Sequence, residues 1–246
     1  MNAMSAPTAP FAIFGDYAAD LWGVVIGGED ARVAVAGLTD ADVVLARAEL
    51  DLDDGETWEL TGPGCALRIE RADPTTATAD GEHSIEPCRV SGSATIAGIE
   101  REFDVGGVRS AALATTDIDS IRLLAAWFPA GHEIALVSAR PRGAKGQDHD
   151  TINVVARGEE HALVFDPRLS TTYDGHGAPR RAGIELWLGG DEDGDGEHRP
   201  RRVAGAATGS RVVGTVAGTP FGVYALECVS RGEMGAGVYA LLGSRS

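Results

Sequence analysis

The densest group of side chains that could do chemistry is Ser170–Arg181, which combines a phenol, a carboxylate, an imidazole and two guanidiniums. Tyr173, Asp174 and His176 belong to the residue types used in general acid–base catalysis, and Asp174 could act with His176 if their side chains meet. The alternative is a glycine-rich hairpin loop whose polar side chains face water. We take these three as candidate catalytic residues, and Arg180 and Arg181 beside them as candidate ligand-binding residues.

A second polar segment, Arg140–Asp150, carries Arg140, Arg142 and Lys145. It lacks the glycine and lysine spacing of a phosphate-binding loop, so no nucleotide site is indicated. It could bind an anion through its cationic side chains, or it could be an exposed loop of mixed charge.

The segment Asp191–Gly196 matches the first half of a calcium-binding loop, with acidic residues at alternate positions and a glycine at the sixth. The twelfth position is Arg202 where an EF-hand needs glutamate, which excludes an EF-hand. The segment is interpreted as an acidic hairpin tip, with weak calcium binding as the open alternative.

Other catalytic and metal-binding patterns are absent from the sequence. There is no G-x-S-x-G motif, and none of the six histidines has the spacing of a zinc site. The cysteines, Cys65, Cys88 and Cys228, form no C-x-x-C pair and are too few for a disulfide framework, although Cys65 and Cys88 could pair across a hairpin. We therefore expect no cofactor, no metal and a reducing, cytoplasmic environment.

The elements that must position these residues are short strands. Ala46–Asp53 alternates between apolar and charged residues, which predicts a strand with Ala46, Ala48, Leu50 and Leu52 on the buried face. Further strands are expected throughout the chain, with hairpins at Ala97–Gly98 and after Ile121–Phe128, a run that also fits a short helix. Many short strands with turn residues between them indicate a sandwich or a barrel.

One strand-like unit occurs twice. Val90–Thr95 reads VSGSAT and Val203–Thr208 reads VAGAAT, and each follows a strand-like run that contains a tryptophan, Trp58 or Trp187. Repetition at a long interval predicts two copies of one β unit, and chance similarity among small residues is the alternative. We expect a disordered leader over residues 1–10, a first β unit over 11–116 and a second over 117–246.

Composition limits the partners. The net charge is −16, and residues 1–100 hold 18 acidic residues against 5 basic ones. Such a surface repels phosphate backbones, so nucleic acid is not an expected partner. No apolar run approaches the length of a membrane-spanning helix.

The paired β units, their strand tryptophans and the segment from Asp166–Arg168 to Arg181–Trp187 resemble the tandem lipocalin-like proteins, a group that includes the hydroxyneurosporene synthase-like and AttH-like families. The resemblance implies an all-β fold of two lipocalin-like antiparallel barrels or curved sheets related by internal duplication, with an apolar ligand inside or between them.

The first functional hypothesis is therefore a binding protein for a small apolar molecule, held in a barrel or an inter-barrel crevice, with Trp58 and Trp187 added to the candidate ligand-binding residues. The second is a hydratase, cyclase or isomerase acting on a terpenoid-like substrate through Tyr173, Asp174 and His176. The third is a structural or assembly protein without a ligand, with a homodimer as one of its forms.

Overall fold

The computed structural model describes residues 8–28, 30–41, 43–52, 56–72, 85–114, 118–145, 151–157, 163–189, 199–216 and 218–243. It contains seventeen β-strands, and none of the described residues is helical. The predicted all-β fold class is confirmed.

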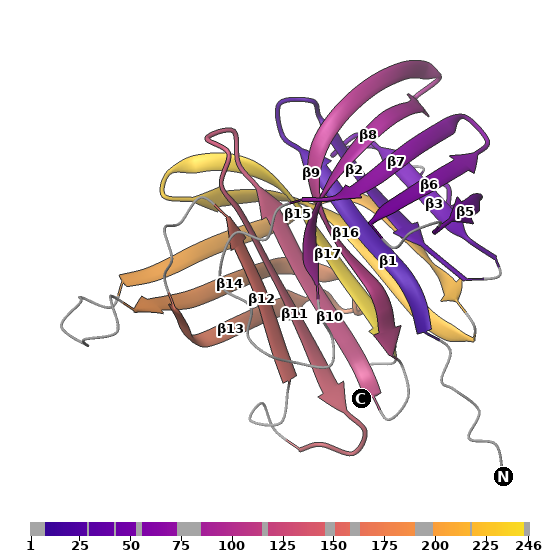
Figure 1. The fold of residues 1–246 in the computed structure, drawn as a ribbon. Helices are drawn as coiled ribbons and strands as arrows, with labels where there is room; N and C mark the ends of the chain where they lie inside the picture. The colour runs from indigo at the N-terminus through magenta and orange to yellow at the C-terminus, as the bar shows by residue number, and fades with distance from the viewer. Residues whose placement is uncertain are drawn as a thin grey trace, which may run out of the picture.

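The strands form two antiparallel sheets that follow one another along the chain (Figure 1). The first sheet contains β1 Thr8–Asp16, β2 Leu21–Ile26, β3 Arg32–Ala36, β4 Ala46–Arg47, β5 Glu49–Asp51, β6 Thr57–Gly62, β7 Cys65–Arg71, β8 Glu86–Ile96 and β9 Ile99–Ala114. The second contains β10 Ile118–Trp127, β11 Glu133–Pro141, β12 Thr151–Arg157, β13 Leu163–Tyr173, β14 Pro179–Gly189, β15 Arg199–Val216, β16 Thr219–Ser230 and β17 Glu233–Gly243.

Both sheets have the same strand order, which is the form that the internal duplication takes. The first runs β3-β2-β1-β9-β8-β7-β6 and the second runs β12-β11-β10-β17-β16-β15-β14. In each, the first strand lies between the second strand and the last. Trp58 in β6 and Trp187 in β14 occupy corresponding strands of the two copies.

The six-residue repeat itself does not mark corresponding strands. Val90–Thr95 lies in β8, which corresponds to β16 of the second sheet. Val203–Thr208 lies instead in β15, which corresponds to β7 of the first sheet. The two segments therefore lie on neighbouring strand positions of the shared topology. Because neighbouring strands are antiparallel, the segments run in opposite directions when the two copies are compared. Gly92 has a φ of 140°, which Gly205 does not share. The predicted equivalence of these segments is therefore wrong, although the duplication is present in the topology.

The first sheet closes into a barrel through the short segment Ala46–Asp51. Ala46 pairs with β3 and Leu50 pairs with β6, so one stretch of chain is hydrogen-bonded to both edges of the sheet. Ala48 and Leu50 pack against the barrel interior as the alternation predicts, but Leu52 is exposed. The second sheet is curved and open, because its edge strands β12 and β13 do not pair within their described residues.

Alternate residues of the central strands pack into different cores, as the period of two in a strand requires. In β1, Phe11 and Ile13 contact the second sheet, whereas Ala12 and Phe14 point into the barrel. Strands β10 and β17 alternate in the same way between the interface and the inner face of the second sheet. Figure 1 shows β1 beside β10 and β17, where the interface core joins the two sheets.

Several local predictions are confirmed. Ala97 and Gly98 both have positive φ and form the predicted turn between β8 and β9. Ile121–Phe128 belongs to β10 and the loop after it, which settles the ambiguity in favour of a strand. No helix of the described residues is long and apolar enough to cross a membrane.

Other predictions need correction. Residues 8–10 do not belong to a disordered leader, because β1 begins at Thr8 and the Pro10 carbonyl accepts a hydrogen bond from the Gly27 amide. Most of Ser170–Arg181 belongs to β13 and β14, so only the residues between Tyr173 and Pro179 form the loop. The three cysteines are free thiols.

Candidate functional site

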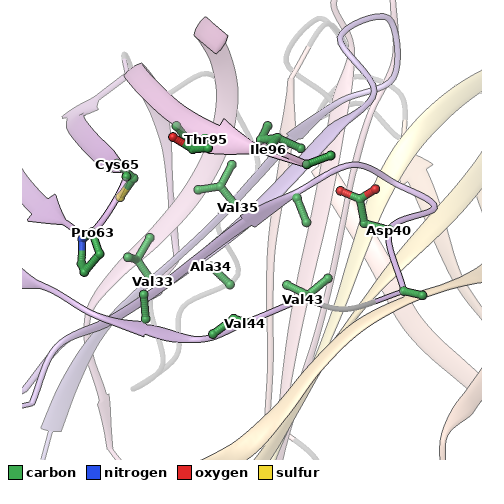
Figure 2. A pocket seen from close by; sticks show the side chains of 16 residues that line it. Val33, Ala34, Val35, Asp40, Val43, Val44, Pro63, Cys65, Thr95 and Ile96 are labelled. Carbon is green, nitrogen blue, oxygen red and sulfur yellow. The ribbon is translucent and has the colours of Figure 1, made fainter. Parts of the chain in front are cut away.

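The mouth of the first barrel contains a cavity of about 580 Å³. Figure 2 shows its wall, formed by the end of β3, the β6–β7 turn, the end of β8 and the connection between β3 and β4. The labelled wall residues are Val33, Ala34, Val35, Asp40, Val43, Val44, Pro63, Cys65, Thr95 and Ile96. Most of these side chains are aliphatic, and polar and apolar atoms contribute about equally to the surface of the cavity.

One wall of this cavity is the rim segment, the described residues 37–41 and 43–45. Its shape is fixed by hydrogen bonds to side chains: Asp40 Oδ2 accepts from the Gly37 amide at 2.7 Å, and Asp20 Oδ1 accepts from the Leu38 amide at 3.0 Å. The Asp40 carboxylate is thereby engaged by the backbone of its own turn. Val44 is 75% exposed, which leaves a large apolar side chain at the entrance.

Cys65 is the reactive group of the mouth cavity. It begins β7 and is partly buried. Burial raises the pKa of its thiol, although a hydrogen bond with the Gly62 backbone acts in the opposite direction. The thiol is therefore a mostly protonated, moderately polar part of the wall at neutral pH.

Below the mouth, the barrel is filled by side chains. Trp58 is 2% exposed there, and the Arg109 guanidinium lies 5.0 Å from the centre of its ring. Arg109 also pairs with Glu86 at 2.8 Å and donates to the Glu56 carbonyl at 2.8 Å. Trp58, a predicted ligand-binding residue, is a packed core residue and lines neither the mouth cavity nor the second cavity described below.

The predicted catalytic residues lie at the β13–β14 turn, where the structure directs their polar groups to different partners. Asp174 Oδ1 accepts from the backbone amides of His176 at 2.8 Å and Ala178 at 2.9 Å. These bonds, led by the one from Ala178, lower the pKa of the Asp174 carboxyl. The carboxylate therefore stabilises a tight turn, while the His176 residue is exposed.

Tyr173 points away from that turn. Its hydroxyl lies 2.9 Å from the Tyr239 hydroxyl, to which Thr171 also donates at 3.3 Å. Tyr239 is fully buried on the inner face of the second sheet, and burial raises the pKa of its phenol. Within the described residues, no side-chain hydrogen bond joins Tyr173, Asp174 and His176 to one another, so their catalytic role stays a prediction.

A second cavity, about 620 Å³, forms a crevice along strands β14, β15 and β16 of the second sheet, and both predicted arginines line it. Arg180 and Arg181 line it together with Arg211 and Tyr224, and Ala41 of the rim segment contributes from the first sheet. Arg211 and Tyr224 could not be found from sequence, because they lie on β15 and β16 and approach β14 only through the pairing of strands.

The remaining predicted residues lie elsewhere. Trp187 is half-buried and its indole nitrogen donates to Glu185 at 3.1 Å, outside both cavities. Of Arg140–Asp150, residues 146–150 lie outside the described residues, and so does the acidic segment Asp191–Gly196. No group of His, Cys, Asp and Glu that could hold a metal is found among the residues that the structure describes.

Comparisons with known proteins give likenesses to solved structures. No family model and no curated protein matches the chain. A crystal structure from Nitrosomonas europaea, provisionally assigned as AttH in its description, superposes with a TM-score of 0.42 and 10% identity, over 96% of this chain and 92% of that one. The fold described above rests on the strand pairing of this chain itself.

Proposed function

We propose that this protein binds a small apolar molecule in the mouth of its first barrel. The observation that carries the proposal is the cavity of about 580 Å³ whose lining side chains are mostly aliphatic, at the mouth of a barrel with a packed hydrophobic core. Binding pockets for small molecules typically have such a volume and are lined mainly by apolar side chains with a few polar groups. In this proposal the first β unit, residues 11–116, supplies the cavity.

The rim segment supports the proposal, because the second unit, residues 117–246, holds it in place. Ser210 Oγ donates to the Gly37 carbonyl at 3.1 Å, and the Thr208 hydroxyl donates to the Leu38 carbonyl. A wall fixed before binding loses little conformational entropy when the ligand arrives.

The experiment compares two aspartate substitutions at exposed valines. Val44 lines the cavity, whereas Val213 is 60% exposed on β15 and lines neither cavity. We expect Val44→Asp to weaken the binding of the neutral fluorophore N-phenyl-1-naphthylamine about tenfold, since a charge at the entrance must be partly desolvated. Val213→Asp adds the same charge and should leave the dissociation constant unchanged. Equal effects of the two substitutions, or no saturable binding to the native protein, would refute the proposal.

A further inference from the structure

The crevice along β14, β15 and β16 carries a second, chemically different site. We propose that it binds a small amphiphilic molecule through one anionic group, a carboxylate or a phosphate, held by Arg180 and Arg211, which lie on the same face of the second sheet, with Arg181 on the opposite face of β14 adding positive charge nearby. The site is separate from the mouth cavity and does not depend on the function proposed there.

The first argument is that these guanidiniums lack partners in an acidic protein. Ion pairs occupy many of the other arginines, namely Arg47, Arg68, Arg71, Arg89, Arg109, Arg168 and Arg202. Within the described ranges, no ion pair or hydrogen bond involves the side chains of Arg180, Arg181 or Arg211. An anion from outside could therefore pair with these guanidiniums without displacing a partner from them.

The second argument is how the sheet brings the three residues to one opening. Arg181 pairs with Ala206, the last residue of β15 that pairs with β14. Beyond it the register of β15 shifts, Gly209 takes a φ of 101°, and pairing with β16 resumes at Arg211 opposite Tyr224. The opening left where β15 departs from β14 is the crevice, so both arginines of β14 and Arg211 of β15 border it.

The third argument concerns the other polar groups of the crevice. Asp174 is the carboxylate that lines it, and this group already accepts the two amides of its own turn. Ser210 is engaged as well, because its hydroxyl accepts from Trp22 and donates to Gly37. The excess charge of the crevice is therefore positive.

The rest of the wall is apolar and fixes the kind of ligand. Ala41, Ala178, Pro179, Ala206 and Ala207 line the crevice beside the Tyr224 ring. A purely ionic ligand would leave this surface uncovered in a cavity of about 620 Å³. An anionic head with an apolar body matches both parts of the wall.

The test measures binding of dodecanoate, dodecyl phosphate and dodecanol by calorimetry below their aggregation concentrations. We expect both anions to bind and dodecanol to bind at least about tenfold more weakly, with anion affinity falling as salt is raised. Arg180→Gln and Arg211→Gln should each weaken anion binding about three- to fivefold, because these exposed groups are partly screened by solvent, and the double variant should weaken it more.

The matched control is the double variant Arg32→Gln with Arg101→Gln, which loses the same charge at positions outside the crevice. It should bind dodecanoate as the native protein does. The proposal is overturned if dodecanol binds as tightly as the anions, or if the control weakens dodecanoate as much as the crevice variant. It is also overturned if Val44→Asp removes dodecanoate binding while the crevice variant keeps it, a result that would leave the function proposed for the barrel mouth standing.

Discussion

The indole nitrogen of Trp22 lies 2.8 Å from the Ser210 hydroxyl, in a buried contact that joins the two sheets across 188 positions of sequence. Both groups also reach the Gly37 carbonyl, Trp22 at 3.0 Å and Ser210 at 3.1 Å. Gly37 begins the rim segment, and Ser210 lines the crevice. One hydrogen-bonded cluster therefore connects the two cavities.

Removing the Ser210 hydroxyl should destabilise this connection. Ser210→Ala takes away a buried acceptor and donor, while Trp22 keeps its bond to Gly37, so we expect a loss of about 1–2 kcal/mol in the free energy of unfolding. Ser91→Ala is the control, since Ser91 is half-buried in β8 and should change stability by less than about 0.5 kcal/mol. Urea denaturation of both variants checks this prediction, and equal stabilities would contradict it.

Gly92 should tolerate no side chain. Its φ of 140° is unfavourable for other residues, and a Cβ atom there would lie 2.1 Å from the Ala66 carbonyl oxygen in the neighbouring strand. We expect Gly92→Ala to cost about 2 kcal/mol or more in unfolding free energy. Gly175→Ala meets no atom within 4 Å and should be close to neutral. Thermal and urea unfolding compare the two, and a neutral Gly92→Ala would show that β8 and β7 can separate without cost.

The strand content could be predicted because alternation and turn residues are local signals. The duplication was indicated by Trp58 and Trp187, which do lie on corresponding strands. Ala46, Ala48 and Leu50 face inward as their spacing indicates. The six-residue match misled because valine, glycine and alanine recur in many strands, whereas strand order is a property of the whole sheet. The crevice was only half predictable: Arg180 and Arg181 stand together in the sequence, but Arg211 reaches them through strand pairing.

The candidate catalytic residues also could not be assigned to one site from the sequence alone. Tyr173, Asp174 and His176 are close in sequence, but Tyr173 is the last residue of β13, whereas Asp174 and His176 belong to the turn that follows. Tyr173 points to Tyr239, and Asp174 accepts backbone amides of the turn. Sequence proximity could not show this, because the partner of Tyr173 lies 66 residues away.

The Asp174 carboxyl should titrate below its ordinary pKa of 3.8, because the amides of Ala178 and His176 stabilise its charged form. A lowered folded-state pKa means that the stabilisation is complete above the unfolded pKa and is lost as the pH falls through the folded value. NMR titration of the carboxyl carbon should give a midpoint below 3.8, and the Ala178 amide shift should follow it. In Asp174→Asn that amide shift should no longer titrate. A midpoint at or above 3.8 would contradict the turn geometry.

Among the cysteines, Cys65 should react first with a maleimide. It is partly buried, whereas burial raises the pKa of Cys228 to about 12 and raises that of Cys88 further. The thiolate is the reactive form, so the two buried thiols should label only after unfolding. Mass spectrometry of native and denatured protein checks the order, with Cys65→Ser as the unlabelled control. Equal rates at Cys88 would contradict the packing of the barrel.

The most direct test of binding at the barrel mouth is the rate at which Cys65 is labelled in the presence and absence of N-phenyl-1-naphthylamine. Cys65 lines the mouth cavity, so a molecule bound there must restrict access to its thiol. We predict that saturating ligand slows labelling at least about tenfold in the native protein and in Val213→Asp, and that Val44→Asp needs a correspondingly higher concentration for the same protection. A labelling rate that stays unchanged while the fluorophore binds would place the ligand elsewhere and contradict the proposed function.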